Sequence, residues 1–331
     1  MKMLVIGDKE RFQKYTALSG SSEGLKLTFL PRGAMNAEII AADPEAEFIL
    51  ADAIQPINGE LITALKKLQV IHSEGVAFDA IDLEAARKRN ITVCNCMGAN
   101  ASAVAEQTVL LMLACLRDVI NLDAAVREGR QIQTKEQLML KGVKELGDCK
   151  VGFIGAGQTA QATMKRLASW GCVMAYNKRT RLSLVEEKQL NTHYADLNYL
   201  LASSDIVSIH VPLTDETRNM VNEKFLSAMK ESAILINTAR GEIVDSQALA
   251  DALASGHLSA AGLDTIYPEP VMPDNILLNL PEEVSRKIIL SPHIAGITRG
   301  SFYRAYQVII ENMYNFMSKK ELRNIVSWEI G

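Results

Sequence analysis

The sequence has few of the features that mark secreted, membrane-spanning or nucleic-acid-binding proteins. Its five cysteines are odd in number and show no paired metal-ligand spacing, which favours reduced thiols in the cytoplasm over a disulfide framework. A net charge of −4 gives no reason to expect nucleic acid or an anionic membrane as a partner. The longest strongly apolar run, residues 109–116, is too short to cross a bilayer. The chain enters an apolar segment directly after Met1-Lys2, so no signal peptide is expected.

Internal repeats and low-complexity segments are also lacking. What remains is the composition of an ordinary globular protein, 48% hydrophobic and 22% charged. At 331 residues, the chain is long enough for two domains with substantial cores. Cys94 and Cys96 would point to one face of a strand, and we expect them to be packed in a core rather than to bind a metal.

Short apolar runs alternate with segments of helical spacing, which is typical of βαβ units and a parallel sheet. In the first hundred residues the expected strands are 3–6, 25–29, 48–51 and 70–72, and the expected helices include 38–41 and 61–68. A long helical stretch from residue 101 to about residue 129, interrupted by no proline, is predicted to leave this first domain and enter a second one. An amphipathic helix over about 301–319 is predicted to return to the first domain.

The second domain opens with a glycine-rich segment, residues 150–160. A buried strand over 151–154 precedes Gly155 and Gly157, and a helix begins at Gln158. This arrangement leaves backbone N–H groups at the start of the helix, where the helix dipole favours a pyrophosphate. Ala160 is a permitted substitute at the third glycine position. A glycine pattern alone also fits an ordinary turn, but here strand and helix flank it in the required order.

Residues 172–180 form the next strand and turn, where an acidic residue would bind the ribose 2′-hydroxyl of NAD. No acid stands there before Glu186. Its place is taken by hydrogen-bond donors suited to the 2′-phosphate of NADP, namely Asn177, Lys178, Arg179, Thr180 and Arg181. A solvated basic turn is the alternative. The sequence therefore predicts NADP as the preferred cofactor, with NAD possible.

Polar residues follow the later strands of this domain, and three of them form a chemically meaningful set. Arg240, Glu269 and His293 each come after a separate buried strand, so they are expected at the same sheet edge. An arginine binds a carboxylate bidentately, and a histidine transfers a proton near neutral pH. A neighbouring carboxylate orients the histidine and favours its charged form. Each residue alone could be a surface charge, a solvated turn or a structural imidazole.

The sequence resembles the D-isomer-specific 2-hydroxyacid dehydrogenase family over essentially its whole length. The matching motifs are Gly75-Val76-Ala77-Phe78-Asp79-Ala80-Ile81-Asp82-Leu83, Ala103-Val104-Ala105-Glu106, Gly155-Ala156-Gly157, His210-Val211-Pro212-Leu213-Thr214, Asn237-Thr238-Ala239-Arg240-Gly241, Gly262-Leu263-Asp264, Pro268-Glu269-Pro270 and Ser291-Pro292-His293-Ile294-Ala295-Gly296.

The resemblance implies an α/β protein with a Rossmann-type, doubly wound parallel-sheet nucleotide domain and a smaller flavodoxin-like substrate domain. It implies that residues 1–100 and 298–331 form the substrate (catalytic) domain and that residues 101–297 form the dinucleotide-binding domain. A homodimer without a metal is also implied. The expected catalytic residues are Arg240, Glu269 and His293.

The resemblance also implies two sets of binding residues. The substrate would be bound by Ser73, Glu74, Gly75, Val76 and Arg240, with backbone N–H groups of residues 74–76 holding its carboxylate. The cofactor would be bound by Gly155, Gly157, Gln158, Thr159, Asn177, Lys178, Arg179, Thr180, Val211, Pro212, Thr217, Thr238, Ala239, Arg240, Asp264 and His293, with Asp264 beside the nicotinamide.

Some positions depart from the family pattern. Ala77 replaces a usual glycine, and Met97 replaces a common proline. Ser73 stands where members that act on phosphorylated substrates tend to carry an arginine, and no regulatory domain is expected after Trp328. The expected activity is NADPH-dependent reduction of a small 2-oxo acid such as glyoxylate or hydroxypyruvate. The alternatives are a dinucleotide-sensing binding protein of the same fold and a 3-phosphoglycerate dehydrogenase. Formate dehydrogenases of similar sequence carry a glutamine in place of Glu269.

Overall fold

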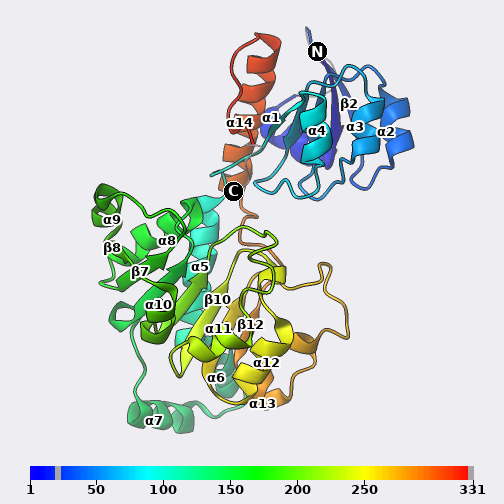
Figure 1. The fold of residues 1–331 in the computed structure, drawn as a ribbon. Helices are drawn as coiled ribbons and strands as arrows, with labels where there is room; N and C mark the ends of the chain where they lie inside the picture. Colours follow the sequence, from blue (N-terminus) through cyan, green and yellow to red (C-terminus); the bar gives the residue numbers. More distant parts are fainter. Residues whose placement is uncertain (19–23, 327–331) are drawn as a thin grey trace. The chain divides into compact units, whose positions relative to one another are not determined.

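A computed structural model describes residues 1–18 and 24–326, so Trp328 lies outside the described residues. The chain divides into two compact units (Figure 1). Unit 1 consists of residues 1–100 and 297–331, and unit 2 consists of residues 101–296. Each unit is built on its own parallel sheet.

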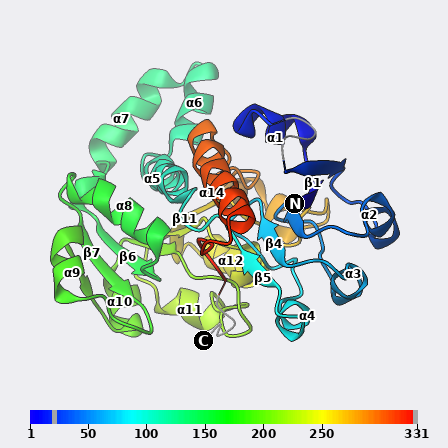
Figure 2. The same cartoon turned by 90° about the horizontal axis from the view of Figure 1, so that it is seen from above.

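Unit 1 contains a five-stranded sheet in the order β2-β1-β3-β4-β5, the flavodoxin-like order with a reversal beside β1. Its elements are β1 (Lys2–Ile6), α1 (Lys9–Thr16), β2 (Lys26–Leu30), α2 (Asn36–Ala42), β3 (Phe48–Ala51), α3 (Gly59–Ala64), β4 (Val70–Ser73), α4 (Leu83–Lys88), β5 (Thr92–Cys94) and α14 (Arg299–Met317). The strands are apolar on both faces because helices cover both. One face packs against α2, α3 and α4, and the other against α1 and α14. Figure 2 shows α3 and α4 on the side of β4 and β5 opposite to α14.

Unit 2 contains a seven-stranded sheet in the order β12-β11-β10-β9-β6-β7-β8, which is the doubly wound Rossmann order with one added strand. The predicted α/β fold class is therefore confirmed for both units. Its strands are β6 (Lys150–Ile154), β7 (Val173–Asn177), β8 (Thr192–Tyr194), β9 (Ile206–Ile209), β10 (Ala233–Asn237), β11 (Leu258–Leu263) and β12 (Ile288–Leu290). Its helices are α5 (Ala101–Leu116), α6 (Val119–Arg127), α7 (Gln131–Lys141), α8 (Gln158–Ala168), α9 (Leu184–Leu190), α10 (Leu197–Ser203), α11 (Glu223–Ala228), α12 (Ser246–Ala254) and α13 (Glu282–Ser285), with short 3₁₀ turns at Leu146–Asp148, Gly241–Ile243 and Ile276–Leu278.

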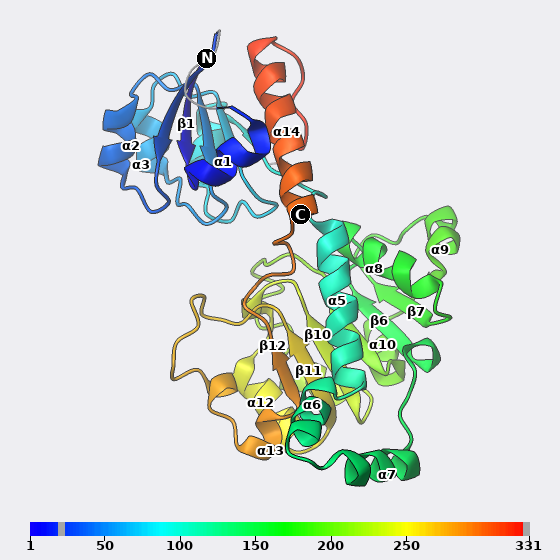
Figure 3. The same ribbon diagram turned by 180° about the vertical axis from the view of Figure 1, so that it is seen from behind.

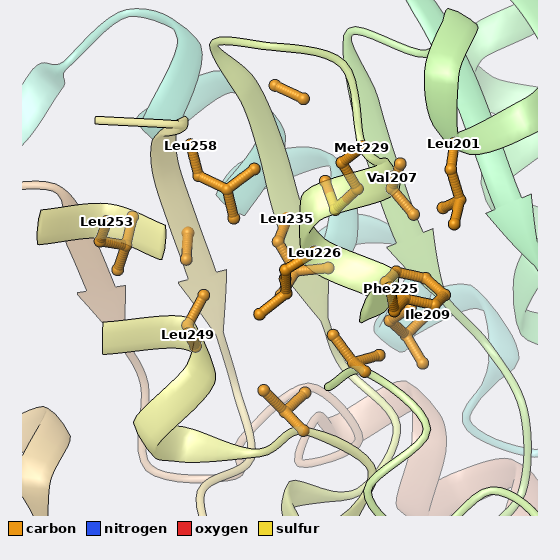
Figure 4. Close-up of a cluster of buried hydrophobic side chains, with 14 of the residues drawn as sticks. Leu201, Val207, Ile209, Phe225, Leu226, Met229, Leu235, Leu249, Leu253 and Leu258 are labelled. Carbon is orange, nitrogen blue, oxygen red and sulfur yellow. The ribbon is translucent and has the colours of Figure 1, made fainter. Parts of the chain in front are cut away.

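Two apolar layers hold the sheet of unit 2. Helices α10, α11 and α12 pack on one face, where Phe225, Leu226 and Leu249 meet side chains of β9, β10 and β11 (Figure 4). Helices α5 and α8 pack on the other face and appear in front of the sheet in Figure 3. Met164 and Leu167 of α8 are fully buried there. Because both faces are covered, the central strands β6, β9, β10 and β11 are buried over most of their length.

The predicted helix over 101–129 was wrong in one respect, because it is broken. α5 ends at Leu116, and Asp118 adopts a left-handed backbone conformation with a φ of 51° before α6 begins. An aspartate tolerates this conformation better than most residues, since its short polar side chain hydrogen-bonds locally. The Oδ1 atom of Asp118 accepts a hydrogen bond from Asn121 in the first turn of α6. The spacing of hydrophobic residues alone does not predict such a break in a helix.

The five cysteines are all free thiols, and Cys94 and Cys96 are fully buried, as the sequence predicts. Across residues 1–18 and 24–326 no group of three or more histidine, cysteine or acidic side chains could hold a metal ion. None of the helices in that part of the chain is long and apolar enough to cross a membrane.

Two buried histidines, His72 on β4 and His210 after β9, predict acid sensitivity. Burial lowers the pKa of His72 to about 4 and that of His210 to about 3, from an ordinary value of 6.5. The unfolded chain takes up protons at these residues as the pH falls below 6.5, whereas the folded chain does not until the pH is much lower. The free energy of unfolding should therefore decrease from pH 6.5 to pH 4, by up to about 1.4 kcal/mol per pH unit for each histidine.

Thermal unfolding followed by calorimetry between pH 7 and pH 4.5 measures this decrease. His72→Gln should flatten the dependence, and His193→Gln, at an exposed position, should leave it unchanged. A midpoint that does not move between pH 6.5 and pH 4.5 in the wild type would contradict the assignment.

Candidate active site

The glycine turn after β6 has the geometry of an anion cradle. Gly155 has a φ of +95°, and a Cβ atom there would lie only 2.4 Å from the carbonyl oxygen of His210. No other residue fits this position without strain. Gly157 caps α8 without a side-chain hydrogen bond. Within the described residues, the N–H groups of Gln158 and Thr159 have no hydrogen-bond acceptor, so the start of α8 suits a pyrophosphate.

The side chain of His210 contacts the first turn of α8 as a neutral imidazole. Its Nε2 atom lies 2.9 Å from Ser208 Oγ, and its Nδ1 atom lies 3.3 Å from Thr159 Oγ1. Its ring lies 5.6 Å from that of Phe153, centre to centre. Since its pKa is about 3, it carries no charge near neutral pH and does not serve as an acid there. Its role in this geometry is to fix Thr159 at the first turn of α8.

The end of β7 places the residues predicted to contact the ribose. Asn177 donates from Nδ2 to Ala195 O at 2.9 Å, so its amide is oriented by the sheet. Arg179 is exposed and lies 3.3 Å from Glu216 Oε2, and Thr180 is exposed. Lys178 is half-buried.

Arg181, the last donor of this predicted set, has a different role. Its guanidinium forms two hydrogen bonds to Glu187, at 2.8 and 2.9 Å, and lies over the Tyr194 ring. This contact, together with a hydrogen bond from Tyr176, lowers the pKa of Glu187 to about 2. The Arg181 side chain is therefore engaged in the structure of the turn.

The segment after β9 is closed by Thr217. Its hydroxyl donates to Pro212 O at 2.7 Å and accepts from Thr214 N at 2.8 Å. Pro212 is exposed and Val211 half-buried. The predicted contact residues Val211, Pro212 and Thr217 thus belong to one small, internally bonded loop.

The turn that carries Arg240 is held by Asn237, a residue whose role the sequence did not reveal. Asn237 is fully buried, accepts from Ala239 N at 3.0 Å and donates to Arg240 O at 2.9 Å. Thr238 is also buried, with its hydroxyl 3.0 Å from Thr108 Oγ1 on α5. Asparagine at a strand end is a common turn residue, which is why its two bonds here could not be foreseen.

The turn that carries His293 is held in the same way by Asp264. This carboxylate is fully buried and accepts from the N–H groups of Ile294 and Ala295, at 3.0 and 2.8 Å. It also accepts from the Ser291 hydroxyl, which in turn accepts from Gln107 Nε2 at 3.0 Å. Both Asp264 oxygens are therefore bonded within the turn.

Two of the three predicted catalytic side chains are in contact. The Nδ1 atom of His293 lies 2.8 Å from one oxygen of Glu269 and 2.9 Å from the other. With Nδ1–H donating to the carboxylate, Nε2 has no partner among the described residues. The His293 side chain is 38% exposed, so Nε2 is able to reach a ligand.

Arg240 comes from β10, the strand next to β11, which in turn lies beside β12. Arg240, Glu269 and His293 thus follow three neighbouring strands at one sheet edge. Arg240 is half-buried and donates from Nη1 to Ala239 O at 2.9 Å.

In unit 1, the loop after β4 corrects two expectations. Ser73 is buried, and its hydroxyl donates to Ala77 O at 2.6 Å and accepts from Gly75 N at 3.2 Å. It therefore closes the loop rather than facing a ligand. The N–H group of Glu74 donates to Ala51 O at 2.7 Å and is used by the sheet. Among the described residues, the N–H groups of Val76 and Ala77 have no acceptor.

The Glu74 side chain is also occupied. It is buried, and its two oxygens accept from Arg11 Nε and Nη2, each at 2.6 Å. The Tyr306 hydroxyl on α14 donates to the same carboxylate. Glu74 therefore does not add an uncompensated negative charge to the loop.

Comparison with known proteins places the sequence and the fold among related proteins. The family model for the NAD-binding domain of D-isomer specific 2-hydroxyacid dehydrogenases matches residues 109–295. A glyoxylate reductase from Korarchaeum cryptofilum is 34% identical over 292 residues, covering 88% of this chain and 86% of the relative. A D-3-phosphoglycerate dehydrogenase from Archaeoglobus fulgidus is also 34% identical, over 296 residues that cover 89% of this chain but 54% of that protein. The crystal structure of the TT0316 protein from Thermus thermophilus superposes with a TM-score of 0.82 at 32% identity, covering 99% of this chain and all of that one.

Proposed function

The chain belongs to the D-isomer specific 2-hydroxyacid dehydrogenase family and is an NAD(P)-dependent oxidoreductase, and from this premise we propose that it reduces a small, unphosphorylated 2-oxo acid such as glyoxylate or hydroxypyruvate to the D-2-hydroxy acid. The His293–Glu269 pair, with Nε2 of His293 accessible, carries this proposal. A proton donor and an arginine at strand ends of the same sheet edge match the two needs of a 2-oxo acid, a proton for its carbonyl oxygen and a cation for its carboxylate.

The cofactor would be held by unit 2, the proposed dinucleotide-binding domain. The position of Gly155 leaves no room for a Cβ, and the exposed start of α8 offers N–H donors, both of which fit a dinucleotide. Asn177, Lys178, Arg179 and Thr180 would contact the ribose of the cofactor. The loop from Val211 to Thr217 would also contact the cofactor. When bound, the nicotinamide supplies the hydride.

Side chains of the protein donate the proton and stabilise the negative charge that develops on the substrate oxygen. His293 donates its Nε2 proton to the 2-oxo oxygen while Glu269 holds Nδ1–H and stabilises the positive ring. Arg240 binds the substrate carboxylate and stabilises the developing negative charge on the oxygen. In unit 1, the proposed substrate domain, we assign carboxylate binding to the N–H groups of Val76 and Ala77, because that of Glu74 is used by the sheet.

The activity itself is tested with a panel of 2-oxo acids, assayed with NADPH and NADH. Glyoxylate and hydroxypyruvate should be turned over, and 3-phosphohydroxypyruvate much more slowly, because position 73 carries a buried serine and no cation. Equal kcat/KM for the phosphorylated acid and hydroxypyruvate would favour the 3-phosphoglycerate dehydrogenase alternative. Cofactor binding with no turnover of any acid would favour a dinucleotide-sensing binding protein.

The cofactor preference is predicted to be NADPH. A charge-assisted hydrogen bond from Arg179 to the 2′-phosphate contributes about 1.5–3 kcal/mol when well placed, which corresponds to about tenfold or more in kcat/KM. Exposure of Arg179 reduces this figure. Asn177→Asp, which adds a repelling charge, and Arg179→Ala should each erode the NADPH preference. Lys224→Ala, at an exposed position of α11, should leave the ratio unchanged. A wild-type preference for NADH would refute the prediction.

The role of Glu269 is tested by a change that keeps the shape of its side chain. An amide in Glu269→Gln stabilises the positive His293 ring less than the carboxylate does. Because His293 donates its proton from the positive ring, kcat for the 2-oxo acid should fall by about tenfold or more in the variant, with KM for the cofactor close to that of the wild type. Steady-state kinetics at saturating cofactor gives this comparison. A kcat equal to that of the wild type would remove Glu269 from the mechanism.

We also propose a homodimer. Helix α7 has no buried residue in this chain, and Ile132, Met139 and Leu140 are 62%, 74% and 90% exposed. Exposed apolar side chains in one helix are typical of a surface that is covered by another subunit. Light scattering should give twice the chain mass, and Leu140→Glu should shift it toward the monomer. A wild-type monomer would contradict this.

A further inference from the structure

The carboxylate of Glu74 connects the loop of residues 73–77 to two helices of unit 1. Arg11 on α1 approaches it with two nitrogens at 2.6 Å, and Tyr306 on α14 donates its hydroxyl. Arg11 also reaches Asp52 after β3, with Nη2 2.9 Å from Oδ2. Four residues that are distant in the sequence thus form one network at the carboxyl edge of the sheet, which we call the Glu74 network.

The Glu74 network is buried and well satisfied. The exposed fractions of the Glu74 and Arg11 side chains are 7% and 25%, and Tyr306 is almost fully buried. The Tyr306 ring stacks on Tyr15 at 5.6 Å and meets Phe12 edge-on at 6.0 Å, so its hydroxyl is held in place. Burial and the neighbouring carboxylate raise the pKa of Tyr306 well above its usual range, so it remains a donor at working pH.

Stability alone gives little reason for such a network. Removing charges from water costs as much as their attraction returns, and apolar side chains of similar volume often stabilise a core equally well. What an ion pair with fixed hydrogen bonds adds is a defined position for the groups attached to it. Here the attached group is the loop that carries the N–H groups of Val76 and Ala77.

The rest of that loop is held by contacts that do not involve the Glu74 network. Ser73 closes it through Gly75 N and Ala77 O, and Asn95 Nδ2 donates to Val76 O at 2.8 Å. Gly75 packs so tightly that a Cβ there would lie 2.8 Å from Ala53 Cβ. These contacts restrict the backbone of the loop, and the Glu74 side chain adds bonds that connect it to α1 and α14.

We propose that Glu74, Arg11 and Tyr306 are positioning residues, which hold the Ser73–Ala77 loop in the conformation whose N–H groups bind the substrate carboxylate. This inference rests on the proposed function and extends it to residues that touch neither substrate nor cofactor. The network sets the affinity for the 2-oxo acid. The residues of unit 2 carry out the proton transfer and hold the cofactor that supplies the hydride.

The kinetic test uses Tyr306→Phe and Glu74→Gln, which keep the shape of each side chain. Each should raise KM for glyoxylate by about tenfold, with kcat within about twofold of wild type and KM for the cofactor unchanged. The matched control is Asp43→Asn. Asp43 is a buried carboxylate paired with Lys26 at 3.2 Å, at the opposite edge of the same sheet. This variant should lose stability but keep the wild-type KM.

A second readout does not depend on turnover. Hydrogen exchange of the Glu74 and Gly75 amides, which are bonded to Ala51 O and Ser73 Oγ, should accelerate at least about tenfold in Tyr306→Phe and Glu74→Gln of the full-length protein, and not in Asp43→Asn. If the wild type reduces no 2-oxo acid, the proposed function fails while hydrogen exchange still tests the network. An unchanged KM with unchanged exchange in both variants overturns the inference. So does an equal rise of KM in the Asp43→Asn control, because the effect would then follow from lost stability alone.

Discussion

Replacing His293 with asparagine is expected to lower kcat for 2-oxo acid reduction by about 10²–10⁴-fold, the usual contribution of a general acid. Asparagine is the suitable replacement because His293 has a φ of 53°, in the left-handed region that asparagine adopts more readily than alanine. The turn bonded to Asp264 should therefore persist, and the affinity for the cofactor should remain close to that of the wild type.

Single-turnover kinetics measures the chemical step directly, and cofactor titration checks that the fold of unit 2 is intact. His193→Asn, at an exposed position on β8, serves as the matched control and should keep the wild-type rate. If His293→Asn retained more than half of the wild-type rate of the chemical step, another group would have to supply the proton.

Arg240→Lys is expected to lower kcat/KM for the 2-oxo acid by about 10²–10³-fold, although the positive charge is kept. A lysine presents a single ammonium and cannot form the two parallel hydrogen bonds that a guanidinium makes to a carboxylate. The turn itself should survive, since Asn237 bonds to the backbone of Ala239 and Arg240 and not to the arginine side chain.

The loss should appear in both KM and kcat, because the arginine contacts the substrate before and during the reaction. KM for the cofactor should change little. Arg218→Lys, at an exposed position in the loop after β9, should leave every constant unchanged. A kcat/KM within threefold of wild type in Arg240→Lys would show that a different residue binds the carboxylate.

The sequence was most informative where a residue type has one physical reason to be present. Apolar runs of strand length predicted the parallel sheets, and Gly155 predicted a turn that no side chain fits. The meeting of Glu269 and His293 also followed, since residues after neighbouring parallel strands share one edge.

The sequence was least informative where a polar residue has several possible partners. Ser73, Asn237 and Arg181 each use their hydrogen bonds within their own loop or turn. Which partner such a residue finds depends on neighbours brought close by the fold, such as Glu187 for Arg181. The same applies to Glu74, whose partners Arg11 and Tyr306 are 63 and 232 residues away in the sequence.

The hydroxyl of Ser73 bears on how enzymes of this kind could exchange substrates during evolution. An arginine at this position would bring the cation that a phosphorylated acid requires, but it would also break both bonds by which Ser73 closes its loop. The first mutation on that path would therefore impair the original activity before the new one is established. An enzyme lineage that acquires this arginine would need a second mutation that closes the loop again. The order in which the two mutations arise would therefore determine whether the change of substrate can occur.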